Sequence, residues 1–129
     1  MSGDNIIQKI DYHQLAQNFV NFFFAKWATN PLEFVTNGLF FEKSKMNLNG
    51  NILSGADIVK EMINMANGGD LVFSVNKTQA LDTGSRRVDI LVTGTMIKNG
   101  VKYNFSNYIL IIYQNETWKI QNSIINIFI

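Results

Sequence analysis

The feature that most constrains the fold is a change in the period of the apolar residues near residue 70. Before this point, apolar side chains recur at steps of three and four residues, which is typical of helices with one buried face. After it the period is close to two, which is typical of strands. A chain with helices first and consecutive strands afterwards predicts an α+β fold with an antiparallel meander.

The longest predicted helix spans residues 12–29 and has Asp11 as its N-cap. It ends where Asn30-Pro31 disfavours the α conformation at residue 30. The same dipeptide predicts the start of a second, short helix, with Pro31 at its first position and Glu33 placed for a capping box. Asn37-Gly38 predicts the end of that helix in a left-handed turn.

The segment at residues 39–53 is expected to be irregular and extended. Ser54 is the expected cap of a third helix, which ends at Asn67-Gly68-Gly69. The period-two region predicts strands at residues 71–80, 86–98, 102–114 and 117–128. Asn99-Gly100 is a strong signal for a tight hairpin between the second and third of these strands.

The composition excludes several classes of site. Cysteine is absent, which excludes disulfides, Cys-ligated zinc, iron–sulfur clusters and a thiol nucleophile. A net charge of +1 with 16% charged residues argues against a protein that binds nucleic acid directly. The longest apolar run, at residues 108–113, is too short to span a membrane. His13 is the only histidine, so we expect no metal site and no cofactor.

The length of 129 residues suits one domain, and no linker or repeat divides it, so we expect a single domain over residues 1–129. The first residues, MSGDNIIQKIDYHQ, lack the charged-then-apolar pattern of a signal peptide, and Met1-Ser2-Gly3 is not a myristoylation start. These features predict a cytosolic or nuclear protein.

Both faces of the predicted sheet are apolar. In the third strand, Ile109 and its neighbours at period two point one way, while Tyr108 and Leu110 point the other. The predicted helices suffice to cover only one face, and an uncovered second face would exceed the apolar patches that monomers usually expose. We therefore expect another subunit to cover it. The alternative is a sheet so strongly curled that both faces are buried within one chain.

Few side chains could act as acids or bases. The carboxylates that could face a pocket are Glu42, Asp82 and Asp89, and Asp89 is expected in an exposed ion pair with Arg86 or Arg87. The candidates for acid–base chemistry in a cavity are Tyr12, His13, Glu42, Asp89 and Tyr103. We predict that no two of them meet inside an enclosed pocket, and we expect no catalytic residues.

Several segments, taken in order, resemble the nuclear transport factor 2 family. They are residues 15–23 (LAQNFVNFF), Ser44, residues 48–55 (LNGNILSG), 73–75 (FSV) with Gln79, 91–94 (LVTG), 105–110 (FSNYIL) and 118–123 (WKIQNS). The resemblance implies a cone, in which a curled antiparallel sheet wraps around a long N-terminal helix with two further short helices. Transport members of this family pair through the open sheet face, which implies dimer contacts at Leu91, Tyr108, Leu110 and Ile124.

Within this family the chain is most similar to the related mRNA export protein, on the residues Phe19-Val20-Asn21, Asn49-Gly50-Asn51, Ser54-Gly55 and Trp118-Lys119-Ile120. That protein forms a heterodimer with the large mRNA export receptor. The resemblance implies a non-enzymatic adaptor for nucleocytoplasmic transport, found in the nucleus, the cytoplasm and at the nuclear pore. Nucleoporin Phe-Gly repeats are a further implied partner.

Two alternatives remain open. One is a homodimeric import factor that carries the GDP form of the small GTPase Ran on acidic residues at the mouth of the cone. This chain has Asn49, Lys98 and Lys102 at the matching rim, and like charge against basic residues of the GTPase would be repulsive, so we expect weak binding. The other is a small cavity enzyme or ligand-binding protein, since the same fold hosts ketosteroid isomerases and dehydratases.

Overall fold

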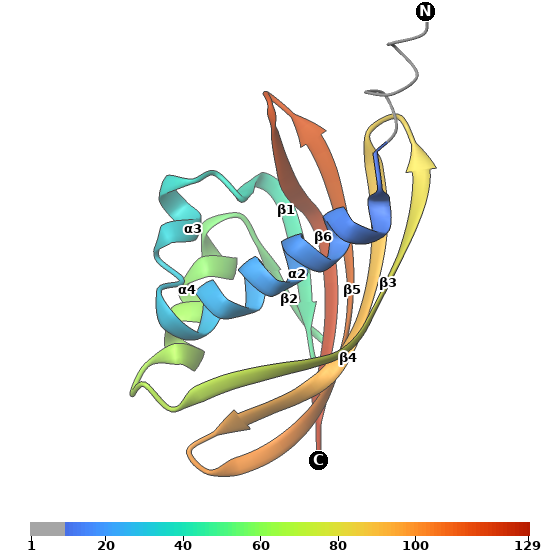
Figure 1. The fold of residues 1–129 in the computed structure, drawn as a ribbon. Coiled ribbons are helices and arrows are strands. Elements are labelled where there is room, and N and C mark those ends of the chain that lie inside the picture. Colours follow the sequence, from blue (N-terminus) through green and yellow to red (C-terminus); the bar gives the residue numbers. More distant parts are fainter. Residues whose placement is uncertain (1–9) are drawn as a thin grey trace, which may run out of the picture.

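One curled sheet of six strands, wrapped around a long helix, makes up the part of the protein that the structure describes (Figure 1). The structure is a computed structural model, and it describes residues 10–129. The α+β cone expected from the sequence is confirmed. The expectations that concern the first nine residues lie outside the described part.

The long helix α2 has the predicted bounds, Tyr12–Thr29. Its N-cap is Asp11, whose side chain accepts a hydrogen bond from the Gln14 N–H. At the other end the Asn30 N–H donates to the carbonyl of Lys26, which closes the last turn before Pro31.

The two short helices differ from the prediction at their starts. Helix α3 is Glu33–Thr36, so it begins after Pro31, and Glu33 pairs with Lys26 of α2 at 3.2 Å instead of forming a capping box. Helix α4 is Ala56–Ala66, and its N-cap is Gly55, with no side-chain cap. The predicted cap at Ser54 is wrong because Ser54 is the last residue of a strand.

The strands are β1 Phe40–Leu48, β2 Asn51–Ser54, β3 Leu71–Gly84, β4 Arg87–Lys98, β5 Val101–Gln114 and β6 Thr117–Phe128. The four later strands match the prediction to within one residue at each end, except that β3 runs four residues further than expected, to Gly84. The sequence prediction missed β1 and β2 within residues 39–53. A distant partner explains why β1 was missed, because β1 pairs with β6. β2 pairs only with β1, across the turn at residues 49–50.

The order of the strands in the sheet is β2-β1-β6-β5-β4-β3, and all neighbours are antiparallel except β1 and β6. Ser44 is buried at the point where the β1–β6 register shifts. Its hydroxyl donates to the carbonyl of Ile120 at 2.7 Å and accepts from the Phe41 N–H at 2.9 Å. These bonds satisfy backbone groups that the irregular pairing leaves free.

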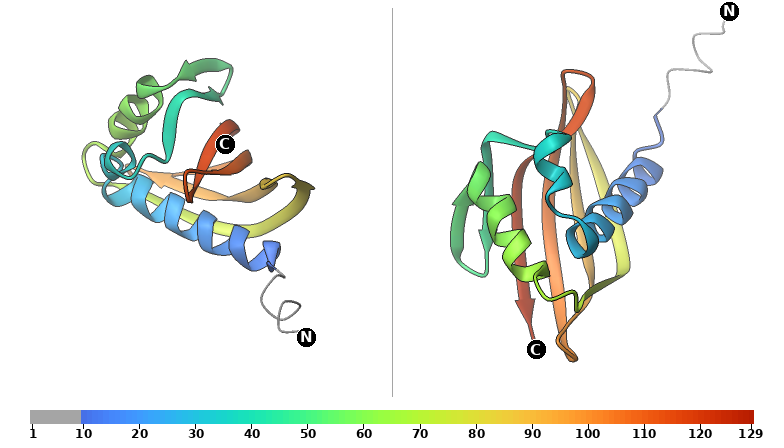
Figure 2. Two further views of the ribbon diagram at one scale, coloured as in Figure 1. Left: turned by 90° about the horizontal axis from the view of Figure 1, so that it is seen from above. Right: turned by 90° about the vertical axis from the view of Figure 1, so that its left-hand side faces the viewer.

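The three helices lie on one side of the curled sheet (Figure 2). Aromatic rings fill the space between the helices and the sheet. The centroid of the Phe24 ring lies 4.8 Å from that of Phe73 and 5.0 Å from that of Phe105. The ring centroids of Trp27 and Phe73 are also 4.8 Å apart. Gly94 makes room for this cluster, since a Cβ atom there would lie 2.2 Å from the Ser74 carbonyl oxygen and 2.8 Å from the Phe105 ring. The inside of the cone is therefore a packed core.

Candidate functional site: the open face of the sheet

The face of the sheet that points away from the helices carries a row of apolar side chains across three strands. Leu91 on β4 lies directly opposite Tyr108 on β5, which lies opposite Ile124 on β6. Leu91 and Ile124 are 45% and 47% exposed, although both belong to central strands. We call this set the apolar row. Large apolar side chains exposed side by side are a common mark of a protein–protein contact surface.

Leu110, the fourth residue expected at a dimer contact, lies one step along β5 on the same face. It pairs with Asp89 on β4 and Asn122 on β6. It is 4% exposed, so neighbouring side chains of its own chain already cover it. The structure thus places three of the four expected residues at the surface of this face and the fourth beneath it.

A short polar contact adjoins the apolar row. The hydroxyl of Tyr108 donates to the carboxylate of Asp89 at 2.5 Å. Burial, followed by this hydrogen bond and the charge of Asp89, raises the pKa of Tyr108 to about 12. The expected ion pair of Asp89 with Arg86 or Arg87 is wrong, because Arg86 lies in the turn before β4 and the carboxylate is bound by Tyr108 instead.

The sequence contained a signal for this contact. The two-residue turn at Asn99-Gly100 pairs Lys98 with Val101, and counting back along both strands pairs Leu91 with Tyr108. Asp89 is then the diagonal neighbour of Tyr108 on the same face, within reach of a long side chain. Sequence reasoning compared Asp89 only with its neighbours along the chain.

The residues expected at a partner-binding rim have separate positions and roles. The Asn49 side chain accepts from the Ile127 N–H at 2.7 Å and donates to the Ile127 carbonyl at 3.2 Å, so it continues the β1–β6 pairing past the strand end. The ammonium of Lys98 donates to the Asn67 carbonyl after α4 at 2.9 Å. Lys102 is exposed on β5. Two of the three thus stabilise the fold.

The candidates for acid–base chemistry are scattered. His13 and Glu42 are exposed, while Tyr12, Asp89 and Tyr103 are half-buried. Within residues 10–129, no hydrogen bond or ion pair joins any two of these five. In the same part of the chain, no group of three or more His, Asp or Glu side chains could hold a metal ion. None of the helices described there is long and apolar enough to cross a membrane.

Two polar side chains inside the cone escaped sequence reasoning. Asn107 and Ser123 are buried among the apolar residues, and the Asn107 amide donates to the Ser123 hydroxyl at 3.0 Å. The amide oxygen of Asn107 and the indole N–H of Trp27 are buried without a hydrogen-bond partner in the described chain. Period two along β5 would have placed Asn107 on the same side as Phe105 and Ile109, but it gives no indication that the amide oxygen lacks a donor.

The chain matches no protein-family model and no curated protein by sequence. By structure it is similar to nuclear transport factor 2 from Cryptosporidium parvum, with a TM-score of 0.77, 20% identity, and coverage of 88% of this chain and 92% of that one. It is also similar to the yeast Ubp3-associated protein Bre5, with a TM-score of 0.77, 15% identity, and coverage of 92% and 98%.

A third similar structure is a putative ketosteroid isomerase from Shewanella frigidimarina, with a TM-score of 0.68, 13% identity, and coverage of 85% and 93%. At these identities the likeness shows the nuclear-transport-factor-2-like fold and leaves the activity open. This fold binds protein partners in at least one case, because the similar structures include the complex of the yeast deubiquitinase Ubp3 with its cofactor Bre5.

Proposed function

We propose that the protein is a non-enzymatic adaptor that binds another protein through the open face of its sheet. The observation that carries this proposal is the apolar row on central strands, where a monomer would normally have polar side chains. Covering such a face removes apolar area from water, and a stable interface of ordinary size buries roughly 800 Å² on each partner.

The inside of the cone supports an adaptor over a cavity enzyme. An enzyme of this fold needs an enclosed space with two or more groups that can exchange protons with a substrate. Here Phe24, Trp27 and Phe105 are buried in that space and pack against its walls. Asn107 and Ser123 bond to each other, and neither is an effective acid or base near neutral pH.

The most specific form of the proposal is an export-type subunit of nucleocytoplasmic transport. Its partner would be the large mRNA export receptor, and it would act in the nucleus, the cytoplasm and at the nuclear pore, with Phe-Gly repeats as a further partner. The support is the resemblance of the sequence to the mRNA export protein, together with the similarity to nuclear transport factor 2 in fold.

Binding of Ran-GDP has less support. Asn49 and Lys98 bond to the backbone, and Lys102 is a cation at the rim where an acidic side chain would be needed. We expect little or no binding by calorimetry at low salt, where charge pairing is least screened. A micromolar or tighter complex under these conditions would favour the import factor.

Sedimentation, alone and with the purified receptor domain, tests the interface. Ile124→Glu places a charge in the apolar row and is expected to abolish pairing, whether the partner is a second copy or the receptor. The matched control is Val35→Glu, because Val35 is 61% exposed on α3, on the helix side of the sheet. If both variants pair like the wild type, the open face is not the interface.

A further inference from the structure

A groove runs along one edge of the cone, between α2 and β3. Its apolar half has a volume of about 410 Å³ and is lined by Asn21, Phe24, Ala25, Ala28 and Thr29 of α2 and by Leu71, Val72, Phe73 and Val75 of β3. Its polar half has a volume of about 310 Å³ and is lined by Gln14, Gln17 and Asn21 of α2 and by Val75, Asn76, Lys77 and Thr78 of β3. Asn21 and Val75 line both halves, so the two hollows adjoin at these residues.

The strand side of this groove is a free sheet edge. β3 is the last strand of the sheet and pairs only with β4. Successive side chains of a regular strand point to opposite faces, yet Leu71, Val72 and Phe73 all line the groove, so its apolar half opens onto the main chain itself. In the polar half the β3–β4 register shifts between Val75 and Lys77, so Asn76 is not paired with β4. Every second residue of an edge strand directs its N–H and C=O groups away from the sheet. Within residues 10–129, no hydrogen bond joins β3 to α2.

The helix side of the groove leaves room for a ligand because its residues are small or carry amides. Ala25 and Ala28 lie beside Phe24, whose ring packs on Phe73 at 4.8 Å. Gln17 and Asn21 provide both donors and acceptors in the polar half. A groove between a helix and a free strand edge binds extended peptides in several domain families, through main-chain hydrogen bonds and pockets for alternate side chains.

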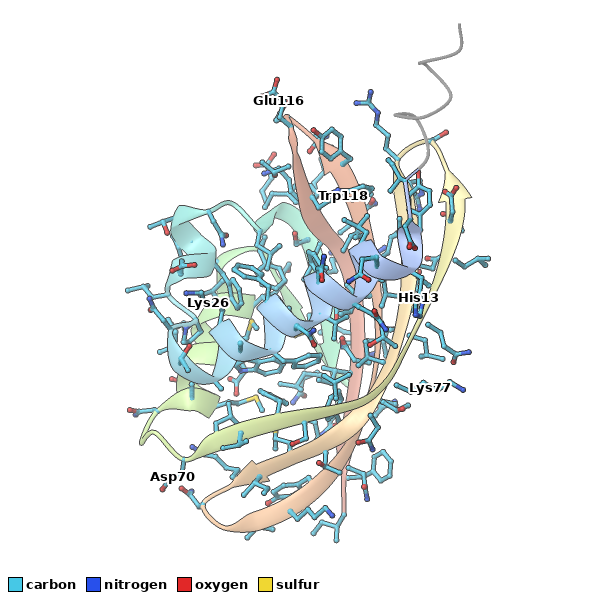
Figure 3. The ribbon with its side chains drawn as sticks, viewed as in Figure 1. His13, Lys26, Asp70, Lys77, Glu116 and Trp118 are labelled. Atoms are coloured by element: carbon cyan, nitrogen blue, oxygen red, sulfur yellow. The ribbon has the colours of Figure 1, made fainter. Side chains whose placement is uncertain are left out.

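The charge on the edge favours a partner peptide over a second copy of this chain. Lys77 lies near the middle of β3 and points away from the sheet at the edge (Figure 3). It has no ion-pair partner within residues 10–129. If two copies paired antiparallel along the whole of β3, their Lys77 side chains would come together near the axis, and like charges opposite each other are destabilising. An acidic side chain at this place would instead be attracted.

We propose that this groove binds an extended segment of a partner protein, which adds to the sheet as a further strand beside β3. The segment carries an apolar side chain that packs against Phe24, Ala28 and Phe73, and an acidic side chain that pairs with Lys77. The site lies apart from the apolar row and does not depend on the proposed function, so an adaptor could use both surfaces at the same time.

The test is selection from a library of random peptides of about nine residues, the upper range of strand length, on the purified protein. The expected consensus alternates apolar residues and contains an acidic residue toward one end. A synthetic peptide of that sequence is expected to slow hydrogen exchange at amides of residues 71–78, and to leave the amides of the other edge strand, β2, unchanged.

Variants locate the binding. Ala25→Trp fills the groove at an exposed helix position and is expected to weaken the peptide about tenfold, and Lys77→Glu is expected to weaken it by a similar factor. The matched controls are Val35→Glu and Leu91→Glu, which are expected to bind the peptide like the wild type. Leu91→Glu also disrupts the apolar row, so loss of pairing there with retained peptide binding separates this site from the proposed function.

Three results would overturn the proposal. They are no enrichment of any peptide, a selected peptide that binds Ala25→Trp as tightly as the wild type, and protection of amides elsewhere than β3. A fourth would replace the occupant: if Ala25→Trp abolishes self-association in sedimentation, a second copy of the chain fills the groove.

Discussion

The two faces of the same sheet differ in what covers them. Ile109 on β5 and Ile124 on β6 are isoleucines on adjacent central strands, but Ile109 is fully buried under the helices whereas Ile124 is half exposed. The concave face is complete within one chain, with aromatic side chains filling the cone. The open face has similar apolar residues without a cover. This contrast shows that an apolar pattern on a strand predicts that the side chains will be buried. It does not say whether the same chain or a partner protein buries them.

The largest expected effect comes from this pair of isoleucines. Ile109→Ala leaves a cavity in the packed core and is expected to lower the free energy of unfolding by about 2–5 kcal/mol. Ile124→Ala removes side chain that is half in water already, so it is expected to cost less than about 1 kcal/mol. Urea unfolding of protein diluted until it is monomeric measures both. Equal costs would mean that the open face is as well packed as the core.

A second effect on the concave face comes from Gly94. Gly94→Ala puts a Cβ atom against the Ser74 carbonyl and the Phe105 ring, so β3 or the ring must move, and we expect a loss of about 1–3 kcal/mol. The control is Thr93→Ala, the neighbouring β4 residue, whose exposed side chain lies on the open face. If Gly94→Ala unfolds at the same urea concentration as Thr93→Ala, the aromatic cluster is looser than the structure indicates.

Substitutions in the buried pair of Asn107 and Ser123 are expected to change the free energy of unfolding less. Comparing a single with a double variant tests whether the Asn107 oxygen lacks a partner. Ser123→Ala removes the nearer acceptor of the Asn107 amide, which keeps only the long contact of 3.4 Å to the Ile124 carbonyl, and is expected to cost about 1–3 kcal/mol. The double variant Asn107→Leu with Ser123→Ala removes both partners together with the unpartnered oxygen, so it is expected to be closer to the wild type than the single variant is. A double variant less stable than the single one would mean that the Asn107 oxygen has a partner, such as a bound water.

The smallest effect concerns pH and the open face. Because the pKa of Tyr108 is raised to about 12, while an unfolded tyrosine titrates near 10, the folded protein holds this proton more tightly. The resulting stability is fully present below pH 10 and is lost as the pH rises from about 10 to about 12. Tyr108→Phe should therefore lose less stability over this interval than the wild type. Unfolding by urea at a series of pH values measures the difference.

The same titration sharpens the comparison of faces. Absorbance at alkaline pH should show a late tyrosine ionisation near pH 12 from Tyr108. A partner that covers the open face would bury Tyr108 further and move its ionisation still higher. If the late step persists in Tyr108→Phe, the shifted tyrosine is a different one.

The parts of the fold that local patterns could predict are those whose contacts are close along the chain. The bounds of α2 followed from its apolar stripe, Asp11 and Asn30-Pro31, and the β4–β5 register followed from Asn99-Gly100. The N-terminus of α4 could not be predicted in this way. Serine is a favourable N-cap residue, but Ser54 is the last residue of β2 and pairs with β1. For the candidate site, period two placed Leu91, Tyr108 and Ile124 on one face, but the burial of Leu110 depends on its neighbours in space.

The sequence by itself determined the three helices, the four strands of the antiparallel meander and the two apolar faces, since these depend on side-chain period and turn residues. Only the tertiary structure decided that β1 lies parallel to β6 and that Asn49 continues that pairing beyond the end of β1. Both features join segments that are distant in sequence, and Asn49 and Ile127 are 78 positions apart. Contacts between distant segments form when the whole sheet and its core become stable together, so no local window of sequence contains them.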